Sequence, residues 1–165
     1  MCSFNLCGCD WIYRILHKEG AQEKEIIGEI DLMAQNETVL EVQRLLKIYG
    51  YNPGSIDGVL GGATRSAIVR FQTDNELNPT RFIDQATWAK LIIFKDNGFI
   101  VNGSLNVKKI QQLLLNKGFN PGKIDGMMGD KTKEAIKNFQ QQQGIKTDGK
   151  IGYQTLLKLS QLEGQ

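Results

Sequence analysis

Residues 50–61 read Gly-Tyr-Asn-Pro-Gly-Ser-Ile-Asp-Gly-Val-Leu-Gly, and residues 118–129 read Gly-Phe-Asn-Pro-Gly-Lys-Ile-Asp-Gly-Met-Met-Gly. The same offset of 68 residues aligns Gln43–Leu91 with Gln111–Leu159 without a gap. From position 42 onward, 20 of 50 aligned positions are identical. Such a long ungapped similarity indicates a duplicated folding unit of about 50 to 60 residues.

Each copy predicts three helices, because apolar residues recur at helical spacing on both sides of the shared stretch. The predicted helices begin near Thr38, Gly61 and Asp84 in copy one, and near Leu105, Gly129 and Gly152 in copy two. Asp84 is a candidate N-cap. Phe71 and Phe139 fall on the apolar face of the second helix, so we expect them in the core.

The loop after the first predicted helix contains a Pro-Gly turn that cannot continue a helix. We expect Ile56 and Ile124 to anchor this loop in the core. Asp57 and Asp125 precede glycine, and each carboxylate can accept hydrogen bonds from nearby backbone N–H groups. Their functional alternative is a hydrogen bond to a ligand.

The predicted fold class is all-α, with two tandem three-helix bundles over residues 36–95 and 104–162. Residues 1–35 form a leader that we expect to be partly helical or disordered, and residues 96–103 form a short linker. A composition of 41% hydrophobic and 23% charged residues is typical of soluble globular proteins. No stretch approaches the roughly 18 apolar residues of a membrane span.

Charge differs between the two copies. Residues 36–95 carry seven basic and six acidic side chains, whereas residues 104–162 carry ten and four. A solvated helical surface explains the lysines of copy two. Attraction to an anionic polymer is the alternative.

The pattern that the two copies largely share matches a known family. In copy one it covers Val42–Leu46, Gly50–Gly54, Ile56–Gly61, Thr64, Ala67-Ile68, Phe71-Gln72 and Thr87-Trp88. In copy two it covers Ile110–Leu114, Gly118–Gly122, Ile124–Gly129, Thr132, Ala135-Ile136, Phe139-Gln140, Asp148-Gly149 and Thr155. This pattern resembles the peptidoglycan-binding-like domain, a small three-helix module that occurs in tandem in many bacterial and phage cell-wall proteins. The resemblance implies non-catalytic binding of peptidoglycan, or a related wall polymer, in the cell envelope.

Two departures from the family pattern distinguish the copies. Copy two has a second Asp-Gly pair, Asp148-Gly149, where copy one has Thr80-Arg81. Copy two has Leu156 where the family usually has tryptophan, whereas copy one has Trp88. The two copies are therefore not expected to bind equally.

Ligand-binding candidates lie mainly on the loop after the first helix, because proline and glycine make that loop rigid and lower the ordering cost of binding. The candidates are Tyr51, Asn52, Ser55, Asp57, Arg65, Trp88, Phe119, Asn120, Lys123, Asp125 and Tyr153. Trp88 could pack in the core or stack on a sugar. Gln72 and Gln140 could bind their own loop backbone or a ligand.

Catalysis is not predicted, and no cofactor is expected. The chain has a single histidine, His17, outside the repeats, and one histidine cannot supply the usual histidine-rich zinc site. Two alternatives to simple wall binding stay open. The chain could be the targeting region of a cell-wall lytic enzyme whose catalytic part is separate or missing, or a protein-docking module. Nucleic acid is not an expected partner, because the lysines of copy two lack interleaved aromatic residues.

Three cysteines, Cys2, Cys7 and Cys9, all lie in the leader. Reduced thiols, an irregular metal site with His17, and a lipobox are the alternatives. Leu6-Cys7-Gly8-Cys9 resembles a lipobox, so a membrane partner is expected only if Cys9 is lipidated. The apolar stretch that a signal peptide needs does not precede it in this sequence, so export is left open.

Overall fold

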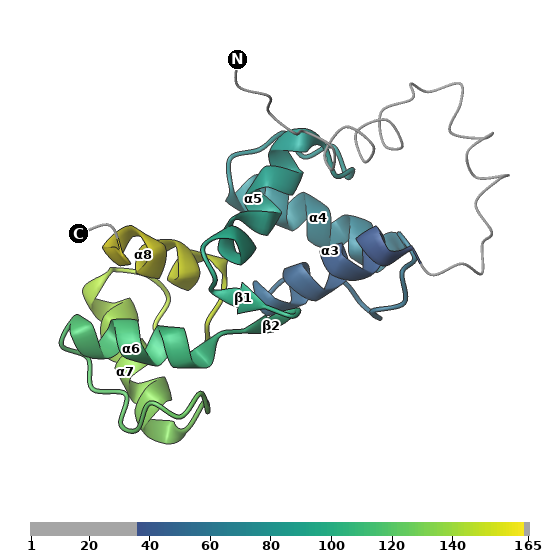
Figure 1. The fold of residues 1–165 in the computed structure, drawn as a ribbon. Helices are drawn as coiled ribbons and strands as arrows, with labels where there is room; N and C mark the ends of the chain where they lie inside the picture. The colour runs from purple at the N-terminus through teal and green to yellow at the C-terminus, as the bar shows by residue number, and fades with distance from the viewer. Residues whose placement is uncertain (1–35, 164–165) are drawn as a thin grey trace, which may run out of the picture. The chain divides into compact units, whose positions relative to one another are not determined.

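The computed structural model describes residues 36–163, and the expected leader lies outside that range. Figure 1 shows the described elements. They are α3 (Glu37–Ile48), α4 (Gly62–Asp74), α5 (Gln85–Asp96), β1 (Ile100–Val101), β2 (Ser104–Leu105), α6 (Val107–Asn116), α7 (Asp130–Gln142) and α8 (Tyr153–Glu163). The all-α prediction is confirmed, since helices make up each repeat and the only described sheet has two short strands.

Side-chain caps fix the starts of three helices. Asn36 precedes α3, and its Oδ1 accepts a hydrogen bond from the Thr38 amide at 3.0 Å. Asp84 precedes α5 and accepts from the Thr87 amide at 2.7 Å, which confirms its predicted N-cap role. Asn106 caps α6 in the same way. Each cap satisfies an amide that has no partner inside the helix.

The first helix of each repeat ends in the same way. The Tyr51 amide donates to the Leu46 carbonyl at 2.8 Å, and the Tyr51 ring packs edge-on against Phe71 at a centroid distance of 5.5 Å. In repeat 2, Phe119 donates to Leu114 at 2.9 Å and packs against Phe139 at 5.6 Å. This backward bond and its apolar contact are typical of a helix C-terminus that turns sharply.

The core of each repeat lies where its helices meet, and equivalent residues fill both cores. Phe71 and Phe139 are fully buried, as predicted. Other fully buried pairs 68 residues apart are Leu46 with Leu114 and Ile68 with Ile136. The prediction for Ile56 was wrong, because its side chain is 37% exposed. Polar contacts from a buried glutamine hold this loop instead of the isoleucine.

A β-hairpin that the sequence analysis did not predict lies between α5 and α6. Ile100 pairs with Leu105, and Val101 pairs with Ser104, in antiparallel register. The turn residues Asn102 and Gly103 both have positive φ angles, of 51° and 69°. Positive φ at both positions is what a two-residue type I′ turn requires, and Asn-Gly is its preferred sequence.

The described residues divide into two compact units whose boundaries differ from those of the repeats. One unit contains residues up to Leu46 and Tyr51–Leu91, and the other contains Lys47–Gly50 and the chain from Ile92 onward. Within residues 36–163, no helix is long and apolar enough to cross a membrane.

An aromatic cluster lies in the core of the second unit. Its members are Tyr49, Phe94, Phe99 and Tyr153, all buried. Tyr153 packs edge-on against Tyr49 at 5.2 Å and against Phe94 at 5.1 Å, and Phe94 also contacts Phe99 at 6.3 Å. Edge-to-face pairs at these distances stabilise a core beyond the burial of area alone.

Candidate ligand-binding loops

A buried glutamine on α3 holds the first loop of repeat 1. Gln43 Oε1 accepts from the amides of Asp57 and Gly58 at 3.0 and 2.9 Å. Its Nε2 donates to Asp57 Oδ1 at 2.9 Å, Val59 O at 3.0 Å and Thr64 Oγ1 at 3.1 Å. The side chain is fully buried, so these bonds satisfy an amide group that would otherwise be costly to bury.

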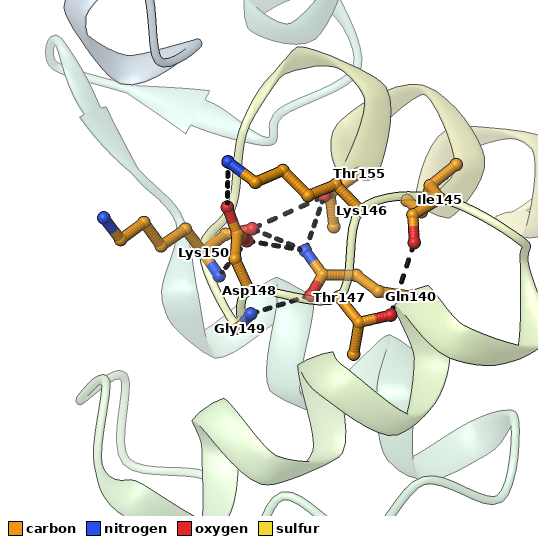
Figure 2. Close-up of polar contacts among 8 residues, drawn as sticks. All are labelled: Gln140, Ile145, Lys146, Thr147, Asp148, Gly149, Lys150 and Thr155. Carbon is orange, nitrogen blue, oxygen red and sulfur yellow. Dashed lines mark hydrogen bonds and ion pairs between the residues drawn. The ribbon is translucent and has the colours of Figure 1, made fainter.

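Figure 2 shows the same arrangement in the second loop of repeat 2. Gln140 points its amide into the loop, where Oε1 accepts from the Gly149 amide at 2.8 Å. Its Nε2 donates to Asp148 Oδ1 at 3.3 Å, Lys150 O at 2.8 Å and Thr155 Oγ1 at 3.0 Å. Thr155 lies near the start of α8, so its bond to Gln140 joins that helix to the loop.

All four loops carry this glutamine–threonine clamp. Gln111 holds the first loop of repeat 2 together with Thr132, and Gln72 holds the second loop of repeat 1 together with Thr87. In each loop the threonine lies seven residues after the first turn residue, which is Asp57, Thr80, Asp125 or Asp148. Each repeat thus contains the same loop-holding device twice.

The clamp answers one question that the sequence left open. Gln72 and Gln140 bind their own loops. Sequence reasoning missed the equivalent role of Gln43 and Gln111. The available signal was a glutamine kept in both copies among apolar positions of a helix, with a threonine 21 residues later.

The loop aspartates are ionised turn acceptors. Hydrogen bonds from Gln43 and the Val59 amide hold the pKa of Asp57 below its usual value. The pKa of Asp125 is lowered first by the Met127 amide, then by Gln111 and the charge of Lys123. These contacts agree with the expected turn-capping role.

The pKa of Asp148 is also lowered, but there burial acts against the hydrogen bonds. Burial acts to raise its pKa, but hydrogen bonds from the Lys150 amide, Gln140 and Lys146 outweigh burial and leave the pKa lowered. A general acid at neutral pH needs a raised pKa. The three loop carboxylates therefore suit a structural role and do not suit proton donation.

Several predicted ligand-binding residues also support their own loop. Asn52 and Asn120 are exposed, and their Oδ1 atoms accept from the amides two residues later at 3.2 and 2.9 Å. Tyr51 and Phe119 are half-buried against the core. A ligand could therefore reach only the exposed part of each of these two side chains.

Ser55 and Lys123 occupy equivalent exposed positions in the first loops. The Lys123 carbonyl accepts a hydrogen bond from Gln111, so the backbone there is held while the side chain projects to solvent. Both side chains are therefore accessible to a ligand, and at Lys123 the backbone is already held in place.

Arg65 joins the two loops of repeat 1. Its Nε donates to the Leu60 carbonyl in the first loop at 3.2 Å. Its Cζ lies 5.3 Å from the ring centroid of Phe82 in the second loop, a distance at which cation–π attraction operates. Phe82 is 43% exposed. Sequence reasoning missed Phe82, although an aromatic residue in a tight turn was an available signal.

The two remaining candidates lie on the third helices. Trp88 is half-buried on α5, which leaves part of its ring accessible. Tyr153 is only 4% exposed, and burial raises its pKa. Because Tyr153 packs inside the aromatic cluster, it has a core role and does not belong to the exposed loop surface.

No metal site is apparent in the described part of the chain, since no three His, Cys, Asp or Glu residues gather closely enough within residues 36–163. Cys2, Cys7, Cys9 and His17 lie outside that range, so the metal and lipobox hypotheses stay predictions.

The fold and its clamped loops define a tandem pair of small helical modules with exposed turn residues. The family model for the peptidoglycan binding domain matches residues 35–91 and matches again at residues 103–159. These matches cover more than half of the chain. The chain therefore belongs to the peptidoglycan binding domain family and contains two copies of its module.

Two relatives extend this comparison. The chain is 31% identical over 134 residues to N-acetylmuramoyl-L-alanine amidase CwlL of Bacillus licheniformis, which covers 78% of this chain and 36% of that protein. It is 30% identical over 111 residues to Uncharacterized protein FadG of Bacillus subtilis (strain 168), covering 63% of this chain and 19% of that protein. The chain thus spans little more than a third of CwlL and about a fifth of FadG. No solved structure matches it significantly.

Proposed function

We propose that the chain binds bacterial cell-wall peptidoglycan without cleaving it, through its two tandem modules. The observation that carries this proposal is the clamp that fixes all four loops before any ligand arrives. A rigid loop loses little conformational freedom on binding, so its exposed side chains can contribute more of their interaction energy to affinity.

In repeat 1, we propose that the Arg65–Phe82 pair is the main contact. The exposed part of an aromatic ring offers an apolar face for the C–H groups of a sugar. The Arg65 guanidinium is held in place by Leu60 and has further N–H groups that suit a carboxylate. Peptidoglycan supplies both groups, since it joins sugars to short peptides.

Exposed loop side chains supply further contacts around this pair. We propose Tyr51, Asn52 and Ser55 in repeat 1, with Trp88 as an additional stacking residue. In repeat 2, the equivalent loop supplies Phe119, Asn120 and Lys123. Asp57 and Asp125 hold the turns and leave an outward carboxylate edge for hydrogen bonds to ligand hydroxyl or amide groups.

The proposal of no catalysis rests on the protonation state of the loop carboxylates. Glycoside cleavage needs one carboxyl group protonated at the working pH and a second carboxylate across the same bond. The pKa values of Asp57, Asp125 and Asp148 are all lowered by hydrogen bonds that these groups accept. Each is therefore charged at neutral pH and cannot act as the protonated partner that cleavage needs.

Two weak sites on one chain gain avidity when both reach the same polymer. This effect suits an insoluble lattice such as the cell wall, where ligand copies are dense. We accordingly propose that the chain acts in the cell envelope or outside the cell.

Co-sedimentation with purified peptidoglycan from which attached polymers have been removed tests the proposal. The chain should pellet with this material, and Phe82→Ala should weaken binding about fivefold, the contribution expected from one aromatic contact. Ile93→Ala is the matched control, because Ile93 is also an exposed apolar residue, 39% exposed, but belongs to helix α5 and not to a loop. A wild-type chain that stays in the supernatant would refute the proposal.

The relation to CwlL favours one alternative, that the chain is the wall-targeting region of a lytic enzyme. The alignment covers most of this chain but little more than a third of the amidase. A hydrolase gene in frame with this chain, or next to it, would support that role. Release of soluble peptide or sugar from walls by the purified chain alone would contradict the non-catalytic assignment.

A further inference from the structure

Six lysines of repeat 2 lie in its two loops or directly against them. We call them the loop lysines: Lys108, Lys123, Lys131, Lys137, Lys146 and Lys150. All six are exposed. Their equivalents 68 residues earlier are all uncharged: Leu40, Ser55, Ala63, Val69, Asn78 and Phe82. At these six positions repeat 2 therefore gained positive charge, whereas Arg65 is matched by Lys133 and Arg81 is replaced by Gly149.

Close contacts place three of these lysines over loop glycines. A Cβ atom on Gly122 would lie 3.1 Å from Cδ of Lys131, and one on Gly149 would lie 3.1 Å from Cγ and Cε of Lys137. Lys108 Cβ lies 3.8 Å from the same position on Gly126. The lysine stems thus cover the turn backbones, and their ammonium groups extend toward solvent, as long amphipathic side chains commonly do.

The other three loop lysines belong to the turns themselves. Figure 2 shows Lys146 reaching Asp148, with an ion pair of 3.4 Å, and Lys150 extending away from the turn. Within the described residues, Lys146 is the only loop lysine in an ion pair with an acidic side chain. Lys123 also acts on Asp125 at longer range. Repeat 2 has four carboxylates beside these six lysines, and the turns use two of them, Asp125 and Asp148.

We propose that the loop lysines bind the phosphodiester groups of a sugar- or polyol-phosphate polymer attached to the cell wall. This inference rests on the proposed wall-binding function and adds a second, wall-attached polymer to the ligands of repeat 2. Lysine is a compact point charge on a flexible stem and therefore suits single, spaced phosphates. A cationic surface also raises the local concentration of a polyanion and speeds its association.

The composition of repeat 2 argues for a polymer without bases. Residues 104–162 contain no arginine, and the described aromatic side chains among them, Phe119, Phe139 and Tyr153, are half-buried or buried. Nucleic-acid surfaces combine a basic groove with exposed aromatic rings on which bases stack. Repeat 2 provides the charges without the rings, whereas repeat 1 provides the exposed Phe82 and Arg65.

The test compares native walls, which retain their phosphodiester polymers, with the same walls treated with hydrofluoric acid to remove them. The full chain should bind native walls at least about tenfold more tightly than treated walls in 0.1 M salt. Raising the salt should weaken binding to native walls, because added ions screen exposed charges.

Matched variants assign this effect to the loops. Lys123→Gln, Lys137→Gln and Lys150→Gln combined should abolish the preference for native walls, since one lysine near an anionic surface contributes about fivefold in affinity. The control combines Arg44→Gln, Lys47→Gln and Lys95→Gln, which remove the same charge from exposed sites on α3 and α5. It should keep the preference.

The outcomes separate this inference from the proposed function. Equal binding to native and treated walls overturns the phosphodiester inference but leaves peptidoglycan binding intact. Binding to neither kind of wall overturns the proposed function itself. A loop-lysine variant that still prefers native walls, or a wild-type chain that binds single-stranded DNA more tightly than native walls, also overturns the inference.

Discussion

The second loops of the two repeats have different sequences and the same backbone. Repeat 2 uses Asp148-Gly149-Lys150, and repeat 1 uses Thr80-Arg81-Phe82. The glutamine of the clamp accepts from Gly149 at 2.8 Å but from Arg81 at 3.2 Å. The turn closes at 2.9 Å in repeat 2, where Lys150 donates to Asp148, and at 3.3 Å in repeat 1.

The difference shows which contacts define the turn. The clamp bonds to a backbone carbonyl and a threonine hydroxyl are kept in both loops, at 2.8 and 3.0 Å in repeat 2 and at 2.7 and 3.0 Å in repeat 1. Because the clamp fixes the backbone, the turn residues were free to change. Arg81 retains the positive φ of the glycine position, 69° against 71°.

The largest effect should come from removing the clamp. Gln140→Met keeps the volume but leaves the Gly149 amide without its acceptor and the Thr155 and Lys150 oxygens without the Nε2 donor. We therefore expect a loss of about 3 kcal/mol in the free energy of unfolding. Gln72→Met should cost less, because its bond to the loop amide is longer. Urea unfolding measures both. Gln141→Met, at an exposed neighbouring position, is the control, and equal costs for Gln72 and Gln140 would contradict the comparison.

A side chain at position 149 should have the next largest effect. Gly149→Ala forces an L-residue into a positive φ and places Cβ 3.2 Å from the Lys133 carbonyl, which is backbone and cannot move aside easily. We expect a loss of about 2 kcal/mol in thermal or urea unfolding. Gly62→Ala, where a new Cβ meets open space, is the control. Similar stability of the two variants would show that the turn backbone can shift to accept a side chain at position 149.

The reverse change should stabilise repeat 1. Arg81→Gly relieves an L-residue at a φ of 69°, and part of that gain is offset by the greater freedom of glycine in the unfolded chain. We expect a gain of about 0.5 to 1 kcal/mol in the free energy of unfolding. Arg81→Lys keeps Cβ and should give no gain. A stabilising lysine variant would instead point to the guanidinium as the cause.

Acid should have the smallest of these effects, and it should destabilise repeat 2 slightly more than repeat 1. The folded pKa values of Asp57, Asp125 and Asp148 are below the unfolded value of about 3.9. Their contribution to stability is therefore full above about pH 4 and is lost as pH falls through the lowered folded pKa values. Repeat 2 has two such turns and repeat 1 has one, because Thr80 replaces the second aspartate.

Thermal unfolding between pH 5 and pH 2 measures this acid dependence. Asp125→Asn with Asp148→Asn should flatten it more than Asp57→Asn does, since asparagine can keep the hydrogen bonds but does not titrate. Asp96→Asn, outside the turns, provides the control. An unchanged pH profile in the double variant would contradict the assigned role of these carboxylates.

The parts of the fold that repeat locally were predictable from the sequence. Helical spacing located the helices to within a few residues, and Phe71 and Phe139 were placed correctly in the core. The clamp was only partly predictable, because a glutamine in a helix usually indicates a solvent-exposed position. Its bonds reach loop residues 8 to 16 positions away, and no short pattern reports on such contacts.

Two residues and one hairpin show where the sequence-based predictions failed. Ile56 looked like a core residue, but the polar clamp made an apolar anchor unnecessary. Tyr153 was a ligand-binding candidate, but it is buried against Tyr49 and Phe94, which come from distant parts of the chain. The Asn102-Gly103 pair was a signal for the hairpin turn. The strands beside it are only two residues long, so they show no clear alternation of apolar and polar residues.

The aromatic cluster bears on how such a chain could be divided or recombined. The sequence suggests a natural cut between residues 96 and 103, but the second compact unit also contains Lys47–Gly50 and Ile92–Asp96. A gene fragment starting after that cut would encode Tyr153 without Tyr49 or Phe94, leaving a large aromatic ring uncovered. A fragment cut at the apparent repeat boundary should therefore be less stable than one that keeps residues 47–50 and 92–96 with the second repeat.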